Sequence, residues 1–205
     1  MKSVLISIHP KLCELIASGE KTIEVRKTRP KVETPFKCYI YETKARSDMP
    51  TFIDEDGHVI YTGRGQVIGE FVCDRIDPIK AVRRDGGSAE RSWKSIFTFM
   101  PSKRHNALLN ATGMETEKIY DYLGGEGKWG YAWHISDLKI YDKPRELSEF
   151  GRGCDAEHIN EIRCRDCKKL VSFEDCCEVM CKPLNRPPQS WCYVEALDGL
   201  RADDS

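Results

Sequence analysis

The chain has 205 residues, of which 40% are hydrophobic and 32% charged, a composition typical of a globular protein and unlike a disordered one. Its 32 basic and 33 acidic side chains nearly cancel, which excludes a generally basic surface, so any nucleic-acid contact must be local. The apolar run before His9 and Pro10 is too short for a signal peptide or a membrane span, so we expect a cytoplasmic protein without a membrane partner.

The length predicts one main domain and an appendage, since domains usually span about 100 to 200 residues. Beyond Phe150, glycines, charges and cysteines replace the periodic apolar residues. We therefore predict a main domain over residues 1–150 and a cysteine-rich tail over residues 151–205.

The N-terminal residues predict a strand and then a short helix. Residues 4–8 are rich in β-branched side chains, which favours a strand. Residues 11–18 carry leucine and isoleucine at helical spacing, and Gly19 follows as the residue that ends the helix. Residues 21–26 then alternate between two faces, with Thr22, Glu24 and Arg26 on one, which is the pattern of a half-buried strand.

Later segments predict further strands and one more helix. Residues 36–41 and 66–76 predict strands joined by a polar hairpin excursion, and residues 130–141 predict a long final strand. Thr112, with Glu115 three residues later, resembles the capping box that begins a helix. Residues 77–111 show no consistent pattern and receive no predicted structure.

The segment from Gly19 to Arg26 reads G-E-K-T-I-E-V-R. At every fixed position it resembles the G-x-K-x-x-E-x-R signature of the ASCH domain family, which belongs to the PUA-like superfamily. Residues 69–71 and 130–137 also resemble segments of bacterial prophage-associated members. The resemblance thus covers roughly residues 1–150.

The resemblance implies an α+β fold, in which a small, bent PUA-like β-barrel is flanked by short helices and has a cleft beside the signature. It also implies binding of RNA or of modified nucleosides. Some relatives are amidohydrolases of nucleosides, whose lysine matches Lys21 and whose glutamate has Glu70 as a candidate. Glu24 stands where that branch carries a threonine.

The residue types of the signature also suit a binding site. Lys21, Glu24 and Arg26 offer a cation, an acceptor and a two-pronged donor, which fits a phosphate or the polar edge of a base. Carboxylates beside a lysine favour its charged form, which suits anion binding better than nucleophilic attack. The alternative is that these charges simply pair on a solvated strand surface.

Basic side chains near an exposed aromatic residue suit a single-stranded or flipped base, and Trp129, between Lys128 and Gly130, is the best stacking candidate. The predicted ligand-binding residues are Lys21, Thr22, Glu24, Arg26, Glu70 and Trp129.

Three functions follow from these residues. The first is an RNA- or modified-nucleotide-binding module. The second is an amidohydrolase of N-acylated nucleosides such as acetylcytidine, with Lys21 and Glu70 as catalytic residues and Thr22 or a water molecule in place of the missing threonine. The third is a protein-interaction adaptor.

Seven of the ten cysteines fall between residues 154 and 192, whereas Cys13, Cys38 and Cys73 stand alone among apolar residues. Isolated thiols of this kind behave as core side chains, while a dense cluster in a cytosolic chain is more typical of metal binding than of disulfides.

Cys164 and Cys167 have the C-x2-C spacing that presents two thiolates to one zinc ion. The second pair must come from Cys176, Cys177, Cys181 and Cys192. We predict a structural zinc held by Cys164, Cys167, Cys181 and Cys192, with Cys177 as the nearest substitute. Disulfides or free thiols are the alternative.

Overall fold

The computed structural model describes residues 2–44, 52–53, 59–61, 63–82, 107, 109–151 and 183–195. Cys164, Cys167 and Cys181 lie outside these ranges, as do most residues of the stretch 83–108.

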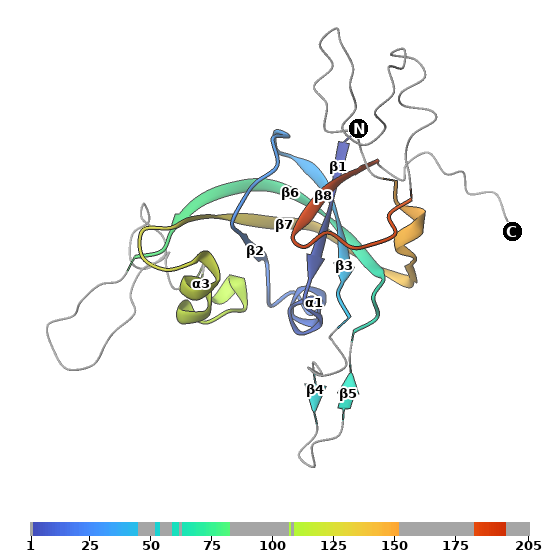
Figure 1. Cartoon of the computed structure of the whole chain (residues 1–205), viewed down its shortest axis with the longest axis horizontal. Helices are drawn as coiled ribbons and strands as arrows, with labels where there is room; N and C mark the ends of the chain where they lie inside the picture. The colour runs from blue at the N-terminus through green and yellow to red at the C-terminus, as the bar shows by residue number, and fades with distance from the viewer. Residues whose placement is uncertain are drawn as a thin grey trace, which may run out of the picture. The chain divides into compact units, whose positions relative to one another are not determined.

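Strands and a few short helices alternate along the described chain, which confirms the α+β class (Figure 1). The strands are β1 (Lys2–Ile8), β2 (Ile23–Arg26), β3 (Phe36–Glu42), β4 (Phe52–Ile53), β5 (Val59–Tyr61), β6 (Val67–Lys80), β7 (Trp129–Arg145) and β8 (Trp191–Glu195). The helices are α1 (Pro10–Ala17), α3 (Thr116–Leu123) and the 3-10 helix η1 (Leu147–Glu149), and residues 109–112 are also helical.

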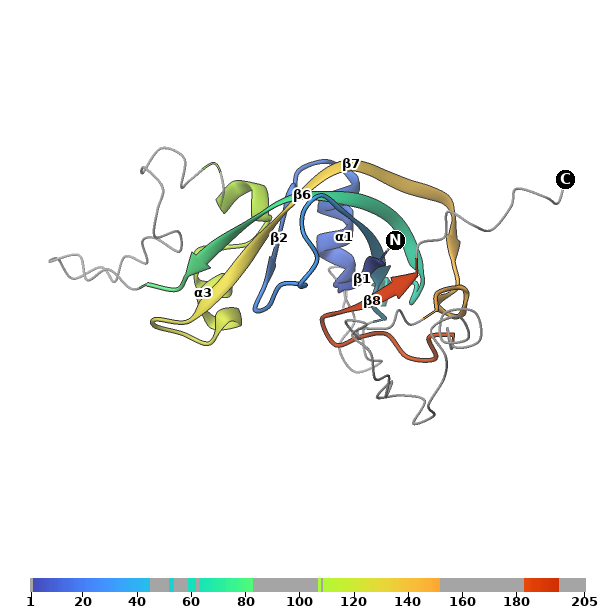
Figure 2. The same ribbon diagram turned by 90° about the horizontal axis from the view of Figure 1, so that it is seen from above.

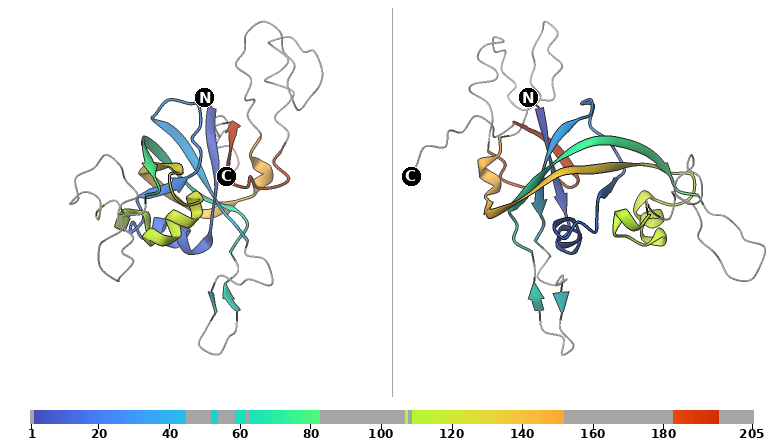
Figure 3. Two further views of the ribbon diagram at one scale, coloured as in Figure 1. Left: turned by 60° about the vertical axis from the view of Figure 1, so that its left-hand side comes forward. Right: turned by 180° about the vertical axis from the view of Figure 1, so that it is seen from behind.

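Six of these strands form one sheet in the order β2-β7-β6-β3-β1-β8. β4 and β5 form a separate two-stranded sheet, drawn as two short cyan arrows in Figure 3. β1 pairs in parallel with β3 and antiparallel with β8, and β2 pairs antiparallel with β7. The strand order is linear, so within the described residues the sheet is open at β2 and β8, whereas the resemblance implied a barrel.

The chain divides into two compact units. We call residues 1–8, 37–70 and 140–205 the terminal unit, and residues 9–36 and 71–139 the signature unit. β6 and β7 contribute residues to both units and lie side by side (Figure 2). The signature segment, α1 and α3 all belong to the signature unit.

The core of the terminal unit joins both ends of the chain. Leu5 of β1 and Val194 of β8 are fully buried in one apolar cluster with Tyr39 and Phe150, whose rings meet edge to face at 5.0 Å. Residues 183–195 belong to the predicted tail, yet they supply β8 to the sheet and place Val194 in this core.

The core of the signature unit lies between α3 and the sheet. Ile119 and Leu123 of α3 pack against Ile23 and Val25 of β2 and against residues of β6 and β7. Gly130 of β7 faces this helix so closely that a Cβ atom there would clash with Leu123. The two apolar side chains of β2 enter this core, which confirms the predicted alternation. All four residues of β2 are buried, however, so the prediction of a half-buried strand is wrong.

The predicted helix over residues 11–18 agrees with α1, whereas the predicted start of the second helix does not agree with α3. Gly19 follows α1 with φ of 78°, a left-handed conformation that glycine adopts without strain. Glu115, not Thr112, is the N-cap of α3, so the predicted capping box is wrong. Thr112 instead ends the helical residues 109–112. None of the described helices is long and apolar enough to cross a membrane.

Replacing Ile119 with alanine should destabilise the fold much more than the same change at Ile140. Ile119 is fully buried between α3 and the sheet, so Ile119→Ala should lower the free energy of unfolding by about 2 to 5 kcal/mol. Ile140 is 37% exposed, and Ile140→Ala should cost less than about 1 kcal/mol. Urea unfolding followed by circular dichroism measures both, and equal losses would contradict the packing of α3 described above.

Candidate functional site

The chain turns sharply between α1 and β2 and carries Lys21 into the interior. After Gly19, the Lys21 N–H donates to the Leu15 carbonyl at 2.8 Å, and the Thr22 N–H donates to the Ala111 carbonyl at 2.8 Å. These two bonds fix the backbone on either side of the lysine. Its side chain is only 1% exposed.

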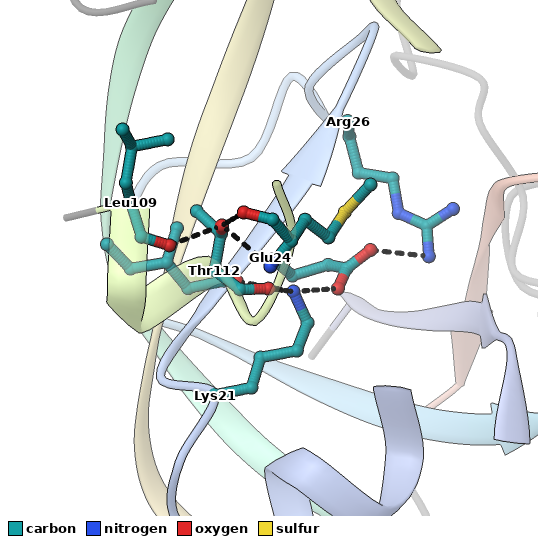
Figure 4. A network of polar contacts seen from close by, with 7 residues as sticks. Lys21, Glu24, Arg26, Leu109 and Thr112 are labelled. Atoms are coloured by element: carbon teal, nitrogen blue, oxygen red, sulfur yellow. Dashed lines mark hydrogen bonds and ion pairs between the residues drawn. The ribbon is translucent and has the colours of Figure 1, made fainter. Parts of the chain in front are cut away.

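The buried ammonium of Lys21 has three oxygen partners. Its Nζ donates to the carbonyl oxygens of Ile23 at 2.6 Å and Thr112 at 2.7 Å, and it lies 3.0 Å from Oε2 of Glu24 (Figure 4). Two of its N–H groups thus donate hydrogen bonds, and the contact with Glu24 is an ion pair, since Oε2 of Glu24 accepts no hydrogen bond. This arrangement offsets the large cost of removing the charge from water.

Glu24 lies between two cations. Its Oε2 faces Lys21, and its Oε1 lies 3.1 Å from Nη2 of Arg26 (Figure 4). All three side chains are buried, with Glu24 4% and Arg26 6% exposed. We call these three residues the charge triad. Removing Glu24 would leave two buried cations without a counter-charge, and removing either cation would deprive Glu24 of one of its two partners, so the triad behaves as a unit.

The register of β2 on β7 determines which side chains accompany the triad. Glu24 lies opposite Trp133, and Arg26 lies opposite Tyr131. Directly opposed residues point to the same side of a sheet, so both aromatic side chains share the face of Glu24 and Arg26. Trp133 is fully buried and meets Phe36 edge to face at 5.8 Å.

Thr112 is a member of the site that the sequence did not indicate. Its carbonyl binds Lys21, and its hydroxyl donates to the Leu109 carbonyl at 2.6 Å and accepts from the Met114 N–H at 3.2 Å (Figure 4). These bonds hold the turn that aims the carbonyl. Thr112 is 91 positions from Lys21, and no local pattern predicts such a contact.

The other predicted residues of the signature unit differ in exposure. Thr22 is exposed, and its backbone carbonyl accepts a hydrogen bond from the Ile135 N–H at 2.9 Å. Trp129 is 49% exposed at the start of β7, with Nζ of Lys80 5.4 Å from its ring. Trp129 is therefore open to solvent, while the charge triad is not.

Glu70 belongs to the terminal unit, where other groups bind its carboxylate. The Tyr141 hydroxyl donates to its Oε2 at 2.7 Å, and Nζ of Lys37 lies 3.6 Å from its Oε1. Burial and the Glu70 carboxylate together raise the pKa of Tyr141 well above its usual value, so the phenol stays protonated and continues to donate. Glu70 thus has a defined structural role in its own unit.

A second polar cluster joins β6 to β7. Nε2 of His134 lies 2.8 Å from Oδ2 of Asp77, which is also 3.2 Å from Nε of Arg75. His134 lies opposite Ile23 in the register of β2 on β7, so it points to the side of the sheet opposite Glu24. The pattern of the sequence did not indicate this cluster.

The predicted zinc ligands are only partly within the described residues. Cys192 lies in β8 opposite Leu5 of β1. Within the described ranges, no group of three or more histidine, cysteine, aspartate or glutamate side chains is placed to hold a metal. Cys164, Cys167 and Cys181 lie outside those ranges, so the zinc site stays a prediction.

Comparison with known proteins gives one family match. A model of the ASCH domain matches residues 6–121, which is more than half of the chain. The structure is similar to that of ASCH from Zymomonas mobilis, with 17% identity, coverage of 71% of this chain and 73% of that chain, and a TM-score of 0.45. One mutant form of that protein matches with 18% identity, coverage of 72% of this chain and 77% of that chain, and a TM-score of 0.43. A second mutant form matches with 16% identity, coverage of 94% of this chain and 88% of that chain, and a TM-score of 0.47. No curated protein matches the chain.

Removing the charge of Lys21 should destabilise the protein strongly. Lys21→Met keeps most of the side-chain volume but leaves the buried Glu24 carboxylate with one cation fewer, so we expect a loss of about 3 to 5 kcal/mol in the free energy of unfolding. Lys118→Met is the control, because Lys118 pairs with Glu115 on the exposed surface of α3 and should change stability by less than about 1 kcal/mol.

Urea unfolding of a double-mutant cycle tests the pairing itself. The double variant Lys21→Met/Glu24→Gln loses the Lys21–Glu24 ion pair only once, so its loss of stability should be smaller than the sum of the two single losses. Strictly additive losses would show that Lys21 and Glu24 do not interact.

Proposed function

The chain belongs to the ASCH domain family, and from this premise we propose that it is an RNA- or modified-nucleotide-binding module that uses the face of β2 and β7 carrying Glu24 and Arg26. The observation that carries the proposal is the charge triad. The signature residues are buried together around a single carboxylate, which is a costly arrangement for a solvated strand surface and a suitable one for a preorganised site.

The three members of the triad have different roles in this proposal. Lys21 is a positioning residue, because its ammonium already has three oxygen partners. It fixes the Glu24 carboxylate, which in turn orients the guanidinium of Arg26. A planar guanidinium presents several donors in a fixed fork, which suits a phosphate or the polar edge of a base. Of the three side chains, that of Arg26 retains the most exposure, 8% against 6% for Glu24 and 0% for Lys21, so Arg26 is the proposed ligand contact.

Aromatic and basic groups beside Arg26 support a nucleic-acid ligand. Tyr131 lies opposite Arg26 and has the Arg29 guanidinium 6.0 Å from its ring centre, and Trp129 is solvent-exposed two positions along β7. Thr22, which is exposed within the signature, is a further proposed contact. Exposed aromatic rings with adjacent cations are what single-stranded RNA and splayed bases require.

The contacts of Lys21 favour binding over amide hydrolysis. A nucleophilic lysine must present a lone pair, whereas the side-chain nitrogen of Lys21 donates hydrogen bonds to two carbonyls and forms an ion pair with Glu24. Glu70, the other proposed catalytic residue, accepts from Tyr141 and is bound by Lys37. Hydrolysis of N-acylated nucleosides is thus the weaker alternative, and the adaptor function rests on no particular contact.

Arg26→Lys should weaken RNA binding while preserving charge. Lysine cannot reproduce the two-pronged geometry of arginine, so we expect roughly tenfold lower affinity for a single-stranded RNA in filter binding. Arg145→Lys is the matched control, because Arg145 pairs with Glu149 through Nε at 2.9 Å in the terminal unit. Binding of all three proteins should weaken as salt rises, since phosphate contacts release counterions.

Equal RNA affinity in wild type and Arg26→Lys would show that Arg26 does not contact the RNA. Absence of RNA binding, together with release of acetate from acetylcytidine, would replace the proposal with the amidohydrolase alternative. If wild type neither binds RNA nor hydrolyses acetylcytidine, only the adaptor function would remain.

We also propose that the tail holds a structural zinc ion in a cytoplasmic protein, on the spacing of its cysteines. Purified wild type should contain about one zinc per chain by elemental analysis, because four thiolates complete a tetrahedral site. Cys164→Ser combined with Cys167→Ser should abolish the bound zinc. Cys154→Ser, in the same tail but outside the proposed ligand set, should retain it. Wild type purified without zinc under reducing, chelator-free conditions would contradict the proposal.

A further inference from the structure

Three aromatic side chains follow one face of β7. Trp129, Tyr131 and Trp133 occupy alternate positions of the strand, so they point to the same side of the sheet. We call them the aromatic row. Exposure rises along it, from the fully buried Trp133 through the partly buried Tyr131 to Trp129, which is 49% exposed.

The intervening residues of β7 confirm this orientation. Gly130 and Ala132 face α3, since Ala132 belongs to the apolar core there and a Cβ atom on Gly130 would clash with Leu123. The aromatic row therefore lies on the opposite side of the sheet, together with Glu24 and Arg26.

A cation accompanies each of the two accessible rings. The Arg29 guanidinium lies 6.0 Å from the ring centre of Tyr131, and Nζ of Lys80 lies 5.4 Å from that of Trp129. The Ala81 N–H donates to the Lys128 carbonyl at 2.8 Å, which holds the end of β6 beside the start of β7 and so places Lys80 near Trp129. Arg26, Arg29 and Lys80 thus place positive charge along the accessible part of the aromatic row.

The spacing of the row selects the kind of nucleic acid that it fits. Side chains two positions apart on a strand are about 6.7 Å apart, because each residue rises about 3.3 to 3.4 Å. Stacked bases in a duplex are only about 3.4 Å apart, so neighbouring bases on this row must be unstacked. Splayed bases on aromatic rings, with cations near the backbone, are typical of single-strand recognition.

We propose that Tyr131 and Trp129 form a two-base stacking track, so that the ligand is a single-stranded oligonucleotide of at least two residues rather than a free mononucleotide. The inference rests on the proposed RNA-binding function. One base stacks on Tyr131 beside Arg26, and the next stacks on Trp129 beside Lys80.

Calorimetric titration with uridine monophosphate and with a 5′-phosphorylated uridine dinucleotide tests the track. Stacking of one more base should make the dinucleotide bind wild type about 5- to 100-fold more tightly than the mononucleotide. Trp129→Ala should abolish this gain, so that the variant binds the dinucleotide no more tightly than the mononucleotide. Trp129→Phe should keep part of the gain, since phenylalanine retains an aromatic ring.

Two variants control for exposed apolar area and for charge. Ile140 is the other large apolar side chain exposed within the described residues, and Lys118 is an exposed lysine on α3. Ile140→Ala and Lys118→Ala should both keep the full dinucleotide gain. Far-UV circular dichroism should be unchanged in all variants, because none of the substituted side chains is buried.

The possible failures are distinguishable. Equal affinity of wild type for the two ligands, or a full gain in Trp129→Ala, would overturn the stacking track while leaving the proposed binding function intact. Binding of neither uridine ligand, together with absence of RNA binding in the filter assay, would overturn the proposed function and this inference with it.

Discussion

The arrangement of the signature unit depends on keeping the ammonium of Lys21 away from water. A buried cation is tolerated only when its donors are satisfied, and the chain supplies two carbonyls and one carboxylate for that purpose. Each acceptor comes with a structural requirement. The turn into β2 places the Ile23 carbonyl beside the ammonium, and the turn after residues 109–112 places the Thr112 carbonyl there. The other oxygen of the Glu24 carboxylate pairs with a second cation, Arg26. The lysine thus organises the region around it.

The antiparallel pairing of β2 with β7 gives these strands one apolar side and one side that carries the signature charges. One side of these strands packs against α3 through Ile23, Val25 and Ala132. The other side carries Glu24 and Arg26 opposite Trp133 and Tyr131. Because side chains alternate strictly between the two sides of a strand, the apolar core fixes the orientation of the polar face without sharing residues with it. The stability of the core therefore limits how far the polar groups can move.

Local features of the fold and site were predictable, and contacts between distant segments were not. Periodicity located α1, the stop at Gly19 and the alternation of residues 23–26, since each depends on neighbouring residues. The burial of Lys21 was not foreseen, because a lysine in a charged segment is normally solvated. Its contact with Thr112 spans 91 positions, and β8 reaches β1 from the opposite end of the sequence. Such pairings leave no periodic pattern in the chain.

The pairing of β1 with β8 also affects how the protein is made. In the register of these strands Leu5 lies opposite Cys192, so one edge of β1 can gain its partner only after residues 9–190 have been synthesised. A ribosome adds roughly 5 to 20 residues per second, which leaves this apolar strand with an open edge for about ten seconds or more. Exposed strand edges promote pairing with other chains. Protection of the nascent β1 by a chaperone would therefore matter more than for a strand that pairs only with nearby residues.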